Sequence, residues 1–64
     1  MTNQAKVLAA LATAPGTASD IAHRTGLSEP QVRRAIESLR REHGYGAVLH
    51  QADLKFALGR LDHL

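Results

Sequence analysis

The sequence predicts an α+β domain that is mainly α-helical, with three helices followed by a C-terminal two-stranded hairpin. Three observations indicate this fold. Capping-box spacings at Thr17 and Ser28 begin two helices on either side of a glycine turn, apolar residues recur at helical spacing before and after that turn, and apolar and polar residues alternate near the C-terminus. A chain of 64 residues is expected to form one small domain over residues 1–64.

The first helix is expected over about residues 3–14, where Pro15 and Gly16 end it. Its amphipathic character is marked by Gln4, Val7, Leu8 and Leu11. The apolar side chains among these are expected to pack on apolar residues of the next two helices, namely Ile21, Leu27, Ile36 and Leu39. Replacing Leu8 or Leu11 by alanine should therefore cost about 2 to 5 kcal/mol of folding free energy.

The second helix is expected over about residues 18–25. Thr17 and Asp20 have the spacing of a capping box, in which the hydroxyl and the carboxylate each accept a hydrogen bond from the other residue's backbone amide. Asp20 also lies at the positive end of the helix dipole. Gly26 then ends the helix, because glycine readily adopts the left-handed conformation that closes a helix.

The third helix is expected over about residues 28–42. Ser28 and Gln31 repeat the capping-box spacing, and Pro30 is tolerated in the first turn because the amides there lack intrahelical partners. Two short helices joined by a glycine turn, with arginines on the second, form the outline of a helix-turn-helix. In that motif the second helix enters the DNA major groove with its N-terminal residues against the base edges.

Helical periodicity divides this third helix into two faces. The core face comprises Val32, Ala35, Ile36 and Leu39. The presented face comprises Pro30, Arg34, Glu37, Ser38 and Arg41, flanked by Gln31 and Arg33. Arg34 is the first candidate for DNA contact, because arginine binds guanine bidentately or grips a phosphate, and Gln31 can pair with adenine in a similar way. Glu37 is compatible with DNA if it accepts from a cytosine amine or braces a neighbouring arginine.

The hairpin is expected over about residues 45–60, with strands at 45–50 and 54–58 and a turn at Gln51, Ala52 and Asp53. The alternation of Leu54, Phe56 and Leu58 favours a half-buried strand that places Lys55 on the other face. However, Leu54, Leu58 and Leu61 also fit helical spacing, and Ala-Asp is not a favoured hairpin turn. A helix at this position is therefore the alternative.

Size and composition exclude several classes of function. A chain this short leaves no room for a cleft with several converging catalytic groups, so we expect no enzyme activity. It contains no cysteine, which excludes a disulfide framework and a thiolate zinc site. Eight basic and six acidic side chains give a net charge of only +2, so any attraction for DNA must come from where the charges are placed. No apolar run approaches the length of a membrane span, and the N-terminus lacks the segments of a secretory signal, so we expect a cytoplasmic protein without a membrane partner.

The histidines do not suggest a metal site. His23, His43, His50 and His63 form no HxxxH or HExxH arrangement. The sequence also contains no nucleophile with a base and an orienting group, and no glycine-rich phosphate loop, so we expect no cofactor. We expect His23 and His43 on the surface, where either side chain can approach a DNA phosphate.

The order of helix, short extended link at residues 16–18, helix, helix and hairpin resembles the winged helix-turn-helix family. The resemblance is carried by DIAHRTGLSEPQVRRAIESLRREHGYGAVLH, which looks like the recognition half of bacterial regulators such as the biotin repressor and multiple-antibiotic-resistance type repressors. It implies a winged helix-turn-helix fold and DNA contacts from the opening and middle of the third helix. The residues that match these positions are Ser28, Gln31, Arg33 and Arg34.

The chain departs from the pattern of this family in two ways. The hairpin tip lacks the arginine, lysine or glycine usual in a DNA-contacting wing, and its nearest basic residues are Lys55 and His50. Regulators of the family generally dimerise or carry an effector domain, so the chain is expected to act as a homodimer or within a larger protein. Leu58, Leu61 and Leu64 could form a patch for self-association, although core closure is the favoured role of these leucines.

These observations predict sequence-specific binding of double-stranded DNA, by a transcriptional regulator or an accessory protein of a phage or mobile element. The predicted major-groove contacts are Ser28, Gln31, Arg33 and Arg34, and the predicted phosphate contacts are Arg41, His23 and Lys55. The alternative is a winged-helix protein-interaction module that does not touch DNA. In that alternative the partner contacts are Glu29, Glu37 and Glu42, and the arginines serve ion pairs.

Overall fold

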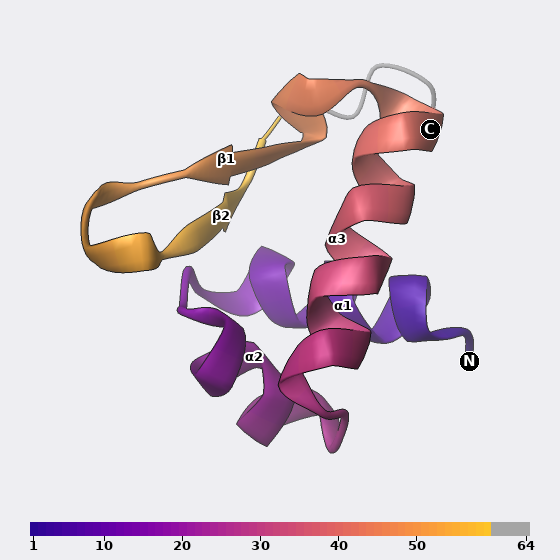
Figure 1. The fold of residues 1–64 in the computed structure, drawn as a ribbon, viewed down its shortest axis with the longest axis vertical. Coiled ribbons are helices and arrows are strands. Elements are labelled where there is room, and N and C mark those ends of the chain that lie inside the picture. The colour runs from indigo at the N-terminus through magenta and orange to yellow at the C-terminus, as the bar shows by residue number, and fades with distance from the viewer. Residues whose placement is uncertain (60–64) are drawn as a thin grey trace.

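The computed structural model describes residues 1–59 of the chain. Three helices, α1 (Asn3–Thr13), α2 (Ala18–Thr25) and α3 (Glu29–His43), precede an antiparallel hairpin of β1 (Val48–His50) and β2 (Phe56–Leu58). Single 3-10 turns, η1 (Tyr45–Ala47) and η2 (Ala52–Leu54), precede the two strands. The hairpin starts near the C-terminal end of α3 and projects to one side of the helices (Figure 1). The fold is the predicted winged helix-turn-helix, and it is mainly helical.

Both predicted capping boxes are present. The Asp20 amide donates to Thr17 Oγ1 at 3.1 Å and the Thr17 amide donates to Asp20 Oδ2 at 3.0 Å. At the start of α3 the Gln31 amide donates to Ser28 Oγ at 3.2 Å, and the Ser28 amide donates to Gln31 Oε1 at 2.9 Å. Gly26 lies between the two helices with φ of +77°, the left-handed conformation predicted for it.

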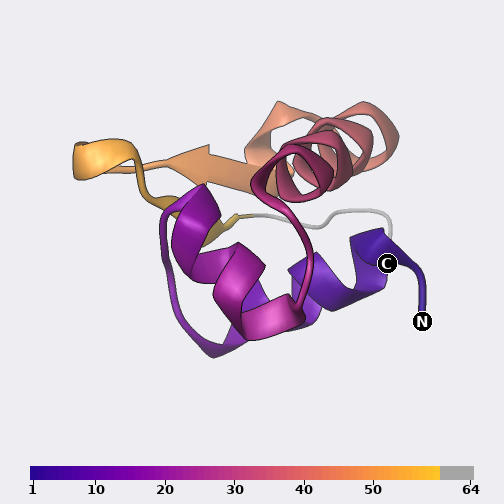
Figure 2. The same cartoon turned by 60° about the horizontal axis from the view of Figure 1, so that its bottom comes forward.

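The core is formed mainly by the three helices, and α3 lies over both α1 and α2 (Figure 2). The buried cluster comprises Val7, Ala10, Leu11, Ala18, Ile21, Val32, Ala35, Ile36, Leu39 and Val48. All four residues predicted for the core face of α3 are in it. The prediction for Leu8 was wrong, because α1 buries Val7, Ala10 and Leu11 at the spacing i, i+3, i+4, and Leu8 is only half-buried at the edge of that stripe.

A short stretch of backbone pairing fixes the hairpin to the helices. β1 and β2 pair with His50 opposite Phe56 and Val48 opposite Leu58. Phe56 also exchanges two hydrogen bonds with Gly16, in the link between α1 and α2, at 3.0 and 2.7 Å. Strands of three residues are marginal in isolation, so the additional pairing of Phe56 with Gly16 stabilises the hairpin. A side chain at position 16 would meet Asp20 Cβ at 2.9 Å, which explains the glycine there.

The boundaries predicted for the hairpin need correction. Residues 45–47 form the turn η1 instead of the start of a strand. The connection between the strands comprises residues 51–55 instead of the predicted 51–53. A hydrogen bond from the Gln51 amide to the Lys55 carbonyl at 2.7 Å closes it. Asp53 and Leu54 adopt left-handed φ values of 62° and 60°, and this turns Leu54 outward, 81 % exposed, where the alternation placed it inward. Phe56 and Leu58 do pack against the core, as expected.

The helix considered for the C-terminal leucines is absent at Leu58, which is part of β2. Packing of Leu58 against the core agrees with the favoured role of core closure. The other two leucines of the possible self-association patch, Leu61 and Leu64, lie outside the described residues, as does His63.

Two arginines connect elements of the fold through backbone carbonyls. Arg40 of α3 donates to the Val48 carbonyl from Nε at 3.1 Å and from Nη2 at 2.9 Å, and its guanidinium carbon lies 5.9 Å from the centre of the Phe56 ring. Arg24 of α2 donates to the carbonyls of Ala14 at 2.8 Å and Pro15 at 3.2 Å. These two side chains therefore hold the hairpin and the α1–α2 link in place.

The different burial of two leucines on α1 gives a matched stability test. Leu11 is 3 % exposed within the core, whereas Leu8 is half-buried. We expect Leu11→Ala to lower the free energy of unfolding by about 2 to 5 kcal/mol and Leu8→Ala to lower it by clearly less. Urea denaturation of both variants checks this. Equal losses would show that the two positions are equally packed.

The capping box of α2 gives a pH-dependent prediction. Hydrogen bonds from the Thr17 backbone and then from its side chain, with smaller contributions from Arg24 and Lys55, hold the pKa of Asp20 below its usual value of 3.8. A carboxyl whose pKa is lower in the folded state stabilises the fold above its unfolded pKa, and this contribution disappears as the pH falls through the folded pKa.

We therefore expect Asp20→Asn to melt below the wild type at neutral pH, and the difference to vanish at pH values below the lowered folded pKa. Thermal melts over a pH series measure it. Asp53→Asn, in the exposed hairpin connection, is the matched control. A difference for Asp20→Asn that persists unchanged at low pH would contradict this account.

Candidate nucleic-acid interface

The solvent-facing side of α3 carries the candidate site. Once the apolar stripe of the helix is buried, the residues about 180° away around the helix must face solvent. A shallow depression on this side is lined by Arg33, Arg34, Glu37, Ser38 and Arg41. The structure thus brings together three of the predicted DNA contacts, Arg33, Arg34 and Arg41, on one exposed face.

The arginines on this face differ in their partners. Arg33 forms an ion pair with Glu29 at 3.8 Å, and both side chains are about half exposed or more. Exposed pairs of this kind contribute about 0 to 1 kcal/mol, so a phosphate or a base can displace Glu29 at low cost. Between residues 1 and 59, neither an ion pair nor a hydrogen bond holds the guanidinium of Arg34 or Arg41. The brace considered from Glu37 to a neighbouring arginine is not formed within that range.

Ser28 and Gln31 lie at the N-terminal end of α3, where their side chains are engaged with the backbone. Gln31 Oε1 already accepts the Ser28 amide, and Ser28 Oγ accepts the Gln31 amide. A bidentate contact of Gln31 with adenine uses both the oxygen and the nitrogen of its side-chain amide. Reading adenine therefore competes with the capping box of the same helix.

His23 and Lys55 lie on other elements and are not part of the α3 depression. His23 is exposed on α2, in a shallow depression shared with Ser19, Asp20 and Arg24. Lys55 is exposed in the hairpin, directly after η2. These two cations can serve the interface only where DNA extends beyond α3 towards α2 or the hairpin.

The two other described histidines, His43 and His50, differ in exposure. His43 was predicted at the surface, but only 15 % of its side chain is exposed, because it lies in the last turn of α3 on the side towards the core. His50 is exposed, and its ring contacts that of Phe56 with ring centres 4.6 Å apart and a tilt of 39°. Over residues 1–59, no group of three or more histidine, cysteine, aspartate or glutamate side chains is placed to hold a metal ion.

Arg40 illustrates a role that the sequence analysis did not assign. Its guanidinium is committed to the Val48 carbonyl, so it supports the hairpin instead of facing solvent with Arg41. Periodicity contains the signal for this difference. Position 40 follows Ile36 by four residues and borders the buried stripe, whereas position 41 follows Arg34 by seven residues and repeats its direction.

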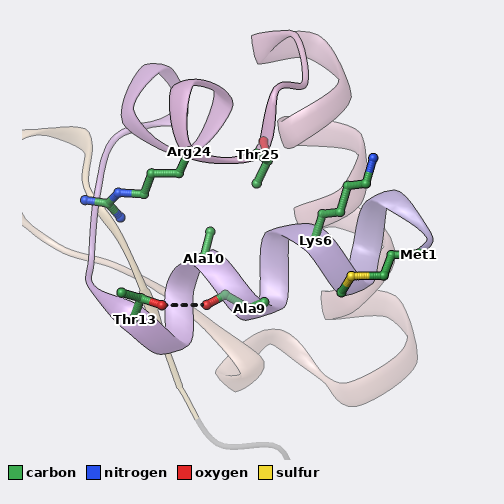
Figure 3. A pocket seen from close by; sticks show the side chains of 7 residues that line it. All are labelled: Met1, Lys6, Ala9, Ala10, Thr13, Arg24 and Thr25. Carbon is green, nitrogen blue, oxygen red and sulfur yellow. Dashed lines mark hydrogen bonds between the residues drawn. The ribbon is translucent and has the colours of Figure 1, made fainter.

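A separate groove of about 420 Å³ lies between α1 and α2 and shares no residue with the α3 depression. In Figure 3 the methyl group of Ala10 points from α1 towards α2, and the side chains of Lys6 and Arg24 lie on opposite sides of it. The Thr13 hydroxyl donates to the Ala9 carbonyl at 3.1 Å, and Arg24 is bonded to the backbone of the α1–α2 link. The Thr13 hydroxyl and the Arg24 guanidinium therefore serve the fold. In the part of the chain that the structure describes, no helix is long and apolar enough to cross a bilayer.

Comparison with known families agrees with this geometry. The model of the IclR helix-turn-helix domain matches residues 3–45, which span all three helices and well over half of the chain. The chain belongs to the IclR helix-turn-helix domain family. No curated protein and no solved structure matches it. Membership supports double-stranded DNA binding and transcription regulation as the broad function of the domain, while the closer likeness to the biotin repressor stays a prediction.

The different roles of two neighbouring arginines can be separated by their effect on stability. Arg40→Gln removes charged hydrogen bonds to the partly buried Val48 carbonyl, and we expect it to lower the free energy of unfolding by about 1 to 3 kcal/mol. Arg41→Gln removes the same charge from an exposed position and should change it by less than about 0.5 kcal/mol. Urea denaturation of both variants tests this, and equal effects would contradict the assigned support of the hairpin.

Proposed function

We propose that this domain binds double-stranded DNA in a sequence-specific manner through the exposed face of α3, as part of a transcriptional regulator. The observation that carries this proposal is the gathering of Arg33, Arg34 and Arg41 around one depression on the second helix of a helix-turn-helix. The net charge of the chain is only +2, so its attraction for DNA depends on where these cations lie.

The length of α3 allows its N-terminal and C-terminal halves to contact different parts of the duplex. Residues in a helix rise about 1.5 Å each, so Arg41 lies roughly 10 Å beyond Arg34 along the axis and points in nearly the same direction. The major groove is about 12 Å wide. With the N-terminal half of α3 in the groove, Arg33 and Arg34 reach base edges and Arg41 reaches the phosphates at the groove edge. Ser28 and Gln31 are assigned to the same groove end, and His23 and Lys55 to phosphates on either side.

The affinity of one copy is expected to be modest and sensitive to salt, because few cations face the DNA. A second copy or a larger protein would supply the rest. For a dimer, half-sites one helical turn apart are expected. Occupancy of such a site would regulate transcription, or would assist a phage or mobile element.

A protein-interaction module is the second candidate. The observation in its favour is Glu37, an acid in the same depression as Arg34 and Arg41. In that case the face would bind a partner of mixed charge, and it would show no affinity for DNA at low salt.

The decisive variant removes Arg33 and Arg34 together by substitution with alanine. Both side chains are exposed, so the melting temperature should barely move, while affinity for a selected duplex should fall at least about tenfold and the salt dependence of binding should weaken. Fluorescence anisotropy with selected and random duplexes at two salt concentrations measures both quantities.

Lys6→Ala is the matched control, because it removes a cation from the groove between α1 and α2 and should bind DNA nearly as the wild type does. If the double variant binds DNA as tightly as the wild type, α3 is not the contact surface. If the wild type fails to bind any duplex at low salt, the protein-interaction function takes first place.

A further inference from the structure

A single tyrosine stands directly beyond the end of α3. Tyr45 is the only tyrosine in the chain and is 84 % exposed. Among residues 1–59, no hydrogen bond engages its hydroxyl. A tyrosine combines an apolar ring with a polar tip, and such residues are enriched at binding interfaces. The fold therefore leaves both the ring and the hydroxyl of Tyr45 available to a partner.

Tyr45 is continuous with the candidate DNA face. A second depression, at the C-terminal end of α3, is lined by Glu37, Arg40, Arg41, Gly44 and Tyr45. Two of these residues, Glu37 and Arg41, also line the first depression. The two depressions thus form one surface that runs along α3 from Arg33 to Tyr45.

One side of the backbone next to Tyr45 is open to close approach, while Gly59 lies against the Gly46 carbonyl on the other. Gly44 has φ of +91°, so the turn that ends α3 requires glycine there. Gly46 has no such φ, and a Cβ added to it would meet no atom within 4 Å among the described residues. Neither backbone conformation nor packing within residues 1–59 calls for glycine at 46. Its lack of a side chain leaves space beside Tyr45 where a partner can approach the backbone.

We propose that Tyr45 binds the sugar–phosphate backbone of DNA, with its phenol hydroxyl donating a hydrogen bond to a phosphodiester oxygen. This inference rests on the proposed DNA binding of α3. Tyr45 lies four residues beyond Arg41, past the edge of the groove that Arg34 enters, where a phosphate strand runs. Tyrosine hydroxyls are common donors to DNA phosphates, and the phenol adds a contact without adding charge.

The charges around the phenol fit this ligand. Arg41 lines the same depression, and within residues 1–59 its guanidinium has no partner, so one phosphate can be approached by a neutral donor and a cation together. Glu37 lines the same depression one helical turn back from Arg41, so the phosphate is expected on the Arg41 and Tyr45 side of this depression, away from the carboxylate. The two ends of α3 then have different tasks, base contacts at the N-terminal half and a backbone contact at the C-terminal end.

The test compares Tyr45→Phe, which removes only the hydroxyl, with Arg41→Gln, which removes a charge from the same depression. A fluorescein-labelled duplex is titrated at several salt concentrations. We expect Tyr45→Phe to raise the Kd about 3- to 10-fold at every salt concentration and to leave the salt slope unchanged. Arg41→Gln should instead reduce that slope by about one counterion. The melting temperature of Tyr45→Phe should equal that of the wild type.

A second measurement identifies the contacted group. Single methylphosphonate replacements, which remove the charge of one phosphate, are introduced in turn along the duplex. At the contacted position the replacement should weaken wild-type binding. It should have a clearly smaller effect on Tyr45→Phe, because that variant already lacks the hydrogen bond between the hydroxyl and the phosphate. If every replacement affects the two proteins equally, Tyr45 does not contact a phosphate and the inference is overturned.

Failure of this inference is distinguishable from failure of the proposed function. If Arg34→Ala weakens binding while Tyr45→Phe binds as the wild type does, DNA binding through α3 stands and the role of Tyr45 is overturned. If the wild type binds no duplex at low salt, both are overturned, and the surface from Arg33 to Tyr45 would then belong to a protein interface.

Discussion

Burial of the apolar stripe of α3 is the constraint on which the rest of the structure depends. An α-helix turns about 100° per residue, so placing Val32, Ala35, Ile36 and Leu39 in the core decides the direction of every other side chain on that helix. Arg34 and Arg41 face solvent for this reason alone. The helices α1 and α2 supply the other walls of the core, and the candidate interface is the opposite side of α3.

The five arginines of residues 1–59 divide into two groups by the same geometry. Arg24 and Arg40 donate hydrogen bonds to backbone carbonyls, and the Val48 carbonyl that Arg40 meets is partly buried, so leaving it without a donor would cost stability. Arg33, Arg34 and Arg41 remain for a partner. In a chain with a net charge of +2, this division determines whether any face is attractive to a polyanion.

Most of the helical part could be predicted because its signals are local. Caps at Thr17 and Ser28, the turn at Gly26 and the periodicity of α3 involve residues within seven positions of one another. The exposure of Leu54 could not be predicted, since it depends on how the hairpin connection closes and on the pairing of Phe56 with Gly16, forty residues away in sequence. In the candidate site, exposure of Arg34 was predictable, while the commitment of Arg40 to a distant carbonyl required the fold.

The capping box at the start of α3 bears on which residue reads sequence. If Gln31 turns to an adenine, the Ser28 amide loses its acceptor, and a hydrogen bond of this kind contributes about 0.5 to 1.5 kcal/mol. A bidentate base contact contributes about 1 to 3 kcal/mol of discrimination, so part of the benefit from Gln31 would be offset. Arg34 gives up no bond within the described chain when it binds. Specificity through α3 is therefore expected to depend on a guanine opposite Arg34 more than on an adenine opposite Gln31.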